Sequence, residues 1–253
     1  MNPIFAKNLG NGKPVILLHG FCESHEIWET TAQALASTYH VFAPDLPGFG
    51  KSTLPDTPFS ISDIAQLLLD WIKSTNIENP VVIGHSLGGY VALAAASQNP
   101  ALFSGLGLFH STAFADTPQK IENRNKAIDF VNKNGVQPYV DTLVAGLFHQ
   151  KDNAAVKLVH SIASATPKET IIGYCRAMRD RPDTSAVLKT LEVPTLLIAG
   201  EFDTFVSVED LQVQAATCRR AHFYTLANVG HMGMFEDGAN SIKMVKNFLD
   251  VCF

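Results

Sequence analysis

Cysteine and long apolar runs, the marks of disulfide-rich and membrane-spanning proteins, are scarce in this sequence. Its 253 residues include four cysteines without a CxxC pair or a regular framework, which predicts free thiols and a reducing, cytoplasmic environment. No apolar run reaches the ~18 residues that a membrane-spanning helix needs, so we expect no membrane partner. The first seven residues lack a charged segment followed by an apolar stretch, which predicts that no secretory signal is present.

Charge is sparse as well. Charged residues make up 17% of the chain and the formal net charge is −5, so we expect no surface for nucleic acid. The one small concentration of basic residues, Lys120, Arg124 and Lys126, is interpreted as the solvated face of a helix. Nine histidines occur without HExxH or a similar ligand spacing, so we expect neither a metal nor a cofactor.

Short apolar runs alternate with helical patterns along the chain, which is typical of a parallel sheet covered by helices on both faces. Residues 4–9 and 15–18 flank Gly10-Asn11-Gly12, and we expect these two runs to pair as an antiparallel hairpin. Further buried strands are expected at residues 41–43, 81–83, 106–109, 195–199 and 223–226.

Helical patterns fill the intervals between these strands. Ser60 or Ser62 can cap a helix with one apolar face, and further helices are expected at residues 86–98 and 239–248. Residues 111–188 show helical periodicity without strands. We interpret this stretch as a helical cap inserted after a central strand, and residues 1–110 and 189–253 as the main α/β domain.

The most informative segment is 81–90, which reads as a strand, then Gly-His-Ser-Leu-Gly, then a helix. A serine in this setting, Ser86, must occupy a sharp turn with strained backbone angles, and the flanking glycines let strand and helix approach each other. The helix that follows points its positive end at a developing oxyanion. The pattern therefore indicates that Ser86 is a nucleophile.

A serine hydroxyl needs a base and an orienting acid, and both occur later in the chain in the order serine, acid, histidine. His231 follows the last strand, with Gly230 before it in the loop. Asp203 lies in the loop after the strand at 195–199, and this position favours it as the orienting acid. Its rivals are Glu201, Asp210 and Asp116.

Three motifs make the chain resemble the α/β-hydrolase superfamily over essentially its full length: the elbow at 84–88, Leu17-Leu18-His19-Gly20-Phe21, and the turn at 45–52. The resemblance implies a mostly parallel twisted sheet with helices on both faces and a helical cap. It also implies an oxyanion hole formed by the backbone N–H groups of Phe21 and Leu87. No single subfamily is fixed by these motifs.

Other residues near these motifs have expected roles outside the triad. His85 is expected to pack behind the elbow, and Arg181 to form an ion pair at the end of the insertion. His110 ends a strand where the mouth of the site should be, so substrate contact and a structural role both remain open. The residues considered as walls of a substrate pocket are Cys22, His110, Phe114, Phe148, Phe205 and Met232.

The chemistry predicted from these residues is acyl transfer to water, on a small or medium and partly apolar ester or thioester. Alternatives with the same triad are a C–C bond hydrolase or a perhydrolase, and a small-ligand receptor with slow turnover. The expected partner is a small-molecule substrate, and the chain is expected to be a monomer or a homodimer.

Overall fold

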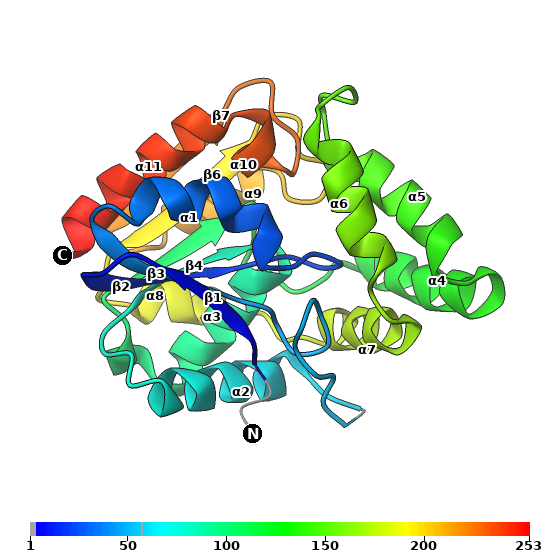
Figure 1. Cartoon of the computed structure of the whole chain (residues 1–253), viewed down its shortest axis with the longest axis horizontal. Coiled ribbons are helices and arrows are strands. Elements are labelled where there is room, and N and C mark those ends of the chain that lie inside the picture. The colour runs from blue at the N-terminus through cyan, green and yellow to red at the C-terminus, as the bar shows by residue number, and fades with distance from the viewer. Residues whose placement is uncertain (1–3, 57) are drawn as a thin grey trace.

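One twisted sheet of seven strands runs through the centre of the computed structural model, which describes residues 4–56 and 58–253 (Figure 1). The strands are β1 (Ala6–Leu9), β2 (Lys13–Leu18), β3 (Tyr39–Pro44), β4 (Val81–His85), β5 (Gly105–Phe109), β6 (Thr195–Gly200) and β7 (Ala221–Leu226). Their spatial order is β1-β3-β2-β4-β5-β6-β7, and all pairs are parallel except β1 with β3. The strands expected from apolar runs are all present.

The predicted hairpin between the first two runs is wrong. β1 pairs with β3, from Ala6 opposite Pro44 to Leu9 opposite Val41. β2 cannot accept β1, because β3 and β4 occupy its two edges. Gly10, with a φ of +73°, carries the chain across the 36–39 turn so that β1 reaches the free edge of β3.

Helices cover both faces of the sheet. Their bounds are η1 (His25–Trp28), α1 (Glu29–Leu35), α2 (Ile61–Ser74), α3 (Leu87–Gln98), η2 (Pro100–Leu102), α4 (Pro118–Asn134), α5 (Val136–Leu147), α6 (Ala155–Ser164), α7 (Lys168–Arg179), α8 (Ser185–Thr190), α9 (Val208–Ala215), α10 (Gly233–Glu236) and α11 (Gly238–Cys252). In Figure 1, α1 and α11 lie along one face, and α2 and α3 along the other. Within residues 4–56 and 58–253, no helix has both the length and the apolar character needed to cross a membrane.

The helix α2 shows why these segments fold locally. Ser60 accepts a hydrogen bond from the Asp63 amide, and the Asp63 carboxylate accepts one from the Ser60 amide, which satisfies two donors at the helix start. Ile64, Leu68 and Trp71 then fall on one side of the helix and are buried. The predicted helix is therefore confirmed, and of the two candidate caps it is Ser60 that serves.

Residues 110–194 form α4 to α8 and contain no strand, as the periodicity predicts. In Figure 1, α4 to α7 gather at one side of the molecule, beyond the sheet. The expected upper boundary at residue 188 falls inside α8, which contacts α3 and so packs with the helices that cover the sheet.

Several polar contacts join this helical segment to the rest, and two of them are short backbone or hydroxyl contacts. The hydroxyl of Tyr174 donates to the Pro47 carbonyl at 2.7 Å, and the Leu147 carbonyl at the end of α5 accepts the His231 amide at 2.8 Å. The second contact joins the segment directly to the loop after β7.

Candidate active site

The carboxyl ends of four strands meet at one edge of the sheet. Leu18 pairs with Gly84, and Phe109 pairs with both His85 and Ile198. The loops after β2, β4, β5 and β6 therefore lie side by side, although more than 180 residues separate the first from the last. In open parallel sheets this edge is where ligands bind.

Ser86 occupies the turn between β4 and α3, with a φ of 48° and a ψ of −114°. A residue with a side chain rarely adopts a positive φ, so this turn holds backbone strain. The hydroxyl of Ser111 donates to the Ser86 carbonyl at 2.6 Å, and the Ser86 amide donates to the Phe109 carbonyl at 3.0 Å. Within residues 81–93, all of them described, Ser86 alone is not buried. The strand, turn and helix expected around Ser86 are present.

The two glycines that flank the turn allow the strand and the helix to approach each other. A Cβ on Gly84 would lie inside the backbone of Gly88, and a Cβ on Gly88 would lie 2.6 Å from the Leu18 carbonyl oxygen. Neither position has room for another residue, which is the physical reason for the Gly-x-Ser-x-Gly spacing.

Two backbone amides at this edge are free to bind an anion. Leu87 is the first residue of α3, so its N–H has no acceptor within the helix. Phe21 follows Gly20, whose position is so close to His85 that a Cβ there would overlap the imidazole. In the described part of the chain, neither the Phe21 amide nor the Leu87 amide donates a hydrogen bond.

His231 and Asp203 are joined by a hydrogen bond of 2.7 Å from Nδ1 to Oδ2, and their side chains are 3% and 0% exposed. The bond fixes the imidazole so that Nε2 is the nitrogen left for chemistry. No hydrogen bond joins the Ser86 hydroxyl to His231 among the residues described. The two loops touch instead through His85, whose Nε2 lies 2.9 Å from the His231 carbonyl oxygen.

Asp203 is held as an anion by four donors. Its Oδ1 accepts the amides of Phe205 and Val206 at 2.8 and 3.1 Å, and its Oδ2 accepts His231 and His110. Burial by itself would raise the pKa of Asp203. The neighbouring histidines outweigh burial and hold that pKa well below its usual range.

Two of the three rival carboxylates have partners elsewhere. Glu201 accepts the Asn228 amide, and Asp116 forms buried ion pairs with Arg181 at 2.7 Å and Arg124 at 3.2 Å. The ion pair expected for Arg181 is confirmed. The interpretation of Arg124 as part of a solvated face is wrong, because this side chain turns inward to a carboxylate that is 1% exposed.

His110 lies behind Asp203, directly after β5. Its side chain is 0% exposed, and its Nδ1 is 3.1 Å from the same Oδ2 that accepts His231. Burial lowers the pKa of His110 to about 4, so the ring is neutral at pH 7 and Nδ1 carries its proton toward the carboxylate. His110 therefore faces Asp203 rather than a pocket, and its prediction as a pocket residue is corrected.

The sequence gives no sign of a second buried pair, formed by Glu23 and His85. The Oε2 of Glu23 lies 2.9 Å from Nδ1 of His85 and also accepts the Gly20 amide. Burial alone would lower the pKa of His85, but Glu23 raises it above its usual value. Burial would raise the pKa of Glu23, but His85 lowers it. Together with the contact from His85 to His231, this pair ties three loops of the site together. His85 packs behind the elbow as expected.

The remaining residues predicted to line a pocket differ in how far their side chains are exposed. Cys22, Phe148 and Met232 are at most 2% exposed and belong to the core, so their prediction as pocket walls is corrected. Burial raises the pKa of the Cys22 thiol well above its usual value, which keeps it neutral. Phe205 is 38% exposed and its ring centroid lies 4.9 Å from that of His231. Phe114 is half-buried.

The donor atoms of His110, Asp203 and His231 lie within 4.8 Å of one another and form the only group in the described chain that could converge on a metal ion. Both nitrogen–oxygen contacts have hydrogen-bond length, at 2.7 and 3.1 Å. We therefore describe the group as a hydrogen-bonded cluster.

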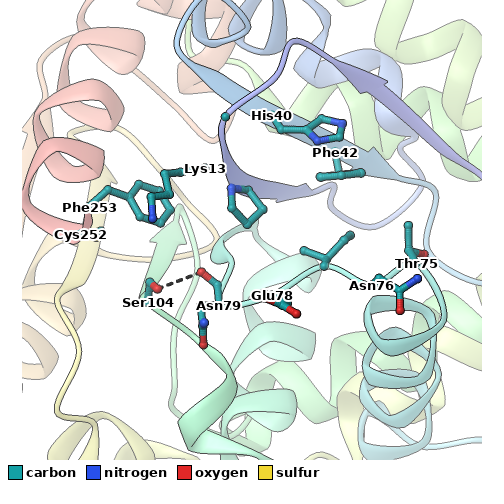
Figure 2. A pocket seen from close by; sticks show the side chains of 13 residues that line it. Lys13, His40, Phe42, Thr75, Asn76, Glu78, Asn79, Ser104, Cys252 and Phe253 are labelled. Atoms are coloured by element: carbon teal, nitrogen blue, oxygen red, sulfur yellow. Dashed lines mark hydrogen bonds between the residues drawn. The ribbon is translucent and has the colours of Figure 1, made fainter.

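A groove of about 580 Å³ lies at the opposite end of the sheet (Figure 2). It is lined by residues at the amino ends of strands, among them Lys13, His40 and Ser104, and by Glu78 and Asn79. The hydroxyl of Ser104 donates to the Asn79 carbonyl across one wall. None of the candidate site residues lines this groove, so its size does not make it the candidate site.

The family described as the alpha/beta hydrolase fold matches residues 13–238. The chain belongs to this family. The fold class expected from the sequence is confirmed, and hydrolase activity is supported by the relatives of this α/β-hydrolase. It is 25% identical over 246 residues to 3-oxoadipate enol-lactonase 1 of Acinetobacter baylyi, covering 94% of this chain and 89% of the relative.

Two further similarities bear on the chemistry of this α/β-hydrolase. A 2-hydroxy-6-oxo-6-(2'-aminophenyl)hexa-2,4-dienoic acid hydrolase of Metapseudomonas resinovorans is 26% identical over 251 residues, covering 95% of this chain and 85% of the relative. The structure of a thermophilic esterase from Thermogutta terrifontis, with malate bound, superimposes with a TM-score of 0.93 at 25% identity. That match covers 98% of this chain and 93% of the esterase.

Proposed function

We propose that this protein is a serine hydrolase that cleaves a small or medium, partly apolar ester or thioester through an acyl-enzyme on Ser86. The observation that carries the proposal is the 2.7 Å hydrogen bond between His231 and Asp203 at the sheet edge where Ser86 stands on a strained turn. Histidine oriented by a buried carboxylate is the base that a serine nucleophile needs.

In the first half of the proposed cycle, the Ser86 Oγ attacks the substrate carbonyl carbon and its proton passes to Nε2 of His231. Asp203 keeps the imidazole in the tautomer that accepts there and stabilises the imidazolium that forms. The carbonyl oxygen becomes an oxyanion, and the free amides of Phe21 and Leu87 are the donors positioned to receive it. Collapse expels the alcohol or thiol, which takes the proton from His231.

In the second half, water attacks the acyl carbon while His231 removes a proton from the water. The Ser86 Oγ is then expelled and takes that proton from His231, which releases the acid product and restores the free enzyme. We place substrate selection in the helical cap formed by residues 111–188, because it lies at the side of the molecule beyond the sheet and fastens to the His231 loop through Leu147. Phe205 beside His231 supplies an apolar wall at the same place.

The enol-lactonase and esterase similarities support cleavage of a carbon–oxygen bond. A second candidate, hydrolysis of a carbon–carbon bond with the same residues, is favoured by the similarity to the Metapseudomonas hydrolase, whose printed substrate is a dienoic acid. A panel of p-nitrophenyl esters, thioesters and enol lactones of graded length, run beside a 2-hydroxy-6-oxo-dienoate, separates the two. Turnover of the dienoate alone would refute the ester proposal.

Labelling by a fluorophosphonate probe tests the nucleophile. The proposal expects the probe to modify Ser86, and Ser86→Ala to abolish both labelling and p-nitrophenyl ester turnover. Ser97→Ala is the matched control, because Ser97 is an exposed serine on α3 away from the elbow. Full esterase activity in Ser86→Ala would refute the proposal.

The acid is tested by two aspartate variants. Asp203→Asn should lower kcat by about 10³–10⁴-fold, because an asparagine would hold His231 in the wrong tautomer. Asp116→Asn removes a buried carboxylate of the same size and should leave kcat per folded molecule nearly unchanged. A loss of activity in Asp116→Asn that matched the loss in Asp203→Asn would contradict the assignment.

A further inference from the structure

His110 is a second histidine that forms a hydrogen bond with Asp203, and the proposed cycle assigns no role to it. Its Nδ1 donates to Oδ2 of Asp203 at 3.1 Å, on the oxygen that also accepts Nδ1 of His231 at 2.7 Å. All three side chains are at most 3% exposed. This carboxylate oxygen is thus a shared acceptor for two imidazoles.

The protein keeps His110 in this place at a cost in folding free energy. Its φ of 48° lies in the left-handed region, which is unfavourable for a residue with a side chain. Its other ring nitrogen, Nε2, is buried without a hydrogen-bond partner, which is also unfavourable. Two such costs at one residue beside an active site are a mark of function rather than of packing.

Two glycines leave the space that the ring occupies. A methyl group on Gly233 would overlap Nε2 of His110, and one on Gly200 would lie 2.9 Å from its Cε1. Gly200 ends β6, just before the Asp203 loop, and Gly233 begins α10, just after His231, so both elements leave room for this imidazole.

We propose that His110 is a positioning residue: its Nδ1–H holds the Asp203 carboxylate in line with His231 and takes up part of the charge on Oδ2. This inference rests on the proposed function of Ser86, His231 and Asp203. Without the His110 donor the carboxylate can rotate away from His231, so fewer molecules hold the base in its working orientation. The negative charge on Oδ2 would also act on His231 alone.

The second effect can be tested through the pH dependence of kcat/KM. A more concentrated negative charge on Oδ2 stabilises the imidazolium of His231, so His231 becomes protonated at a higher pH and the acid limb of the kcat/KM profile moves upward. The other titratable groups around His110 are His231, His85, whose ring centroid lies 6.1 Å away, and Glu23 behind His85. Glu236 on α10 binds the amide of Gly230 beside His231. These groups stay the same in every variant below.

The test compares His110→Leu with His110→Asn. The two side chains have nearly the same shape, but only asparagine carries an N–H where Nδ1 stood, and asparagine also tolerates a positive φ. With an activated ester, His110→Leu should lower kcat by about tenfold, which is the worth of one hydrogen bond to a charged group, and should leave KM within about twofold. The acid limb should rise by about 0.5–1 pH unit.

His110→Asn should recover most of the lost kcat and return the acid limb to its wild-type position. His110→Gly is a second variant without the donor. It relieves the left-handed backbone, so a loss of activity in it cannot come from backbone strain. His40→Leu, in the groove of Figure 2 at the far end of the sheet, is the matched control and should leave both quantities unchanged.

Equal kcat values and equal acid limbs in the leucine, glycine and asparagine variants would overturn the inference. Failure of the proposed function is read separately, as absence of fluorophosphonate labelling in the wild type. The role of His110 is then still measured by the low-field proton resonance of the His231 Nδ1–H. That resonance should shift in His110→Leu and His110→Gly and return in His110→Asn, and an unchanged resonance in all three would overturn the inference.

Discussion

Replacing Glu23 by glutamine removes the anion from the pair that ties three loops of the site together. The Glu23 side chain is 2% exposed and that of His85 is 0% exposed, so water cannot replace the lost partner. Breaking a buried ion pair from one side costs about 3–5 kcal/mol, since the other charge stays buried and unpaired. That is a large share of the stability of an ordinary domain, about 5–15 kcal/mol.

The size of this loss should depend on pH. The pKa of folded His85 is raised, so its contribution is complete below its usual value of 6.5 and is lost as the pH rises through the folded pKa. The pKa of folded Glu23 is lowered, so its contribution is complete above 4.5 and is lost as the pH falls. Both contributions are therefore complete only between pH 4.5 and 6.5.

The assay is urea unfolding of the wild type and Glu23→Gln at about pH 5.5 and about pH 9. The loss of unfolding free energy should be largest at the lower pH and smaller at the higher one. Glu29→Gln is the control, because Glu29 pairs with Lys7 at a surface where both side chains are 39% exposed, and it should cost less than about 1 kcal/mol. An equal loss at both pH values, or a loss no larger than that of Glu29→Gln, would refute the reasoning.

Three other substitutions test the packing around the site. Gly88→Ala should unfold the protein or prevent its expression, because its Cβ would meet the Leu18 carbonyl, whereas Gly238→Ala has open space and should be neutral in the same thermal scan. Asp116→Asn should lower the free energy of unfolding measured in urea by about 3–5 kcal/mol, since it leaves the buried Arg181 without its carboxylate. Phe205→Ala should raise KM for apolar esters by about tenfold and leave kcat nearly unchanged, as steady-state kinetics would show.

The parts of the fold that sequence predicts well are those whose local pattern reflects burial. β4 is buried along its whole length and reads as a continuous apolar run before Ser86. The partner of β1 was not predictable in this way, because Gly10 and Gly12 suit a hairpin and a longer crossing equally. The helices α1 and α9 are not predicted from apolar periodicity, because each buries only two or three side chains.

In the candidate site, too, some residues could be predicted from the sequence and others could not. Ser86, Asp203 and His231 each follow a strand, so a position in the chain order was enough to select them. Glu23 and His85 are 62 residues apart in the chain, and a charged residue in a loop gives no sign that it will be buried against a partner so distant. That Asp203 accepts hydrogen bonds from two histidines could have been suspected from His110, which directly follows β5, the strand adjacent to β6.

Glu236 and Leu147 have a consequence for how this enzyme can be rebuilt. Glu236 accepts the amides of His149 and Gln150 at the end of α5 as well as the amide of Gly230, and Leu147 accepts the amide of His231. The helical segment is therefore not an independent module that can be exchanged at its two chain ends. A chimera that receives this segment from a relative must also receive a carbonyl and two amides that fit residues 230–236, or the grafted protein will have Ser86 in place beside a misplaced His231.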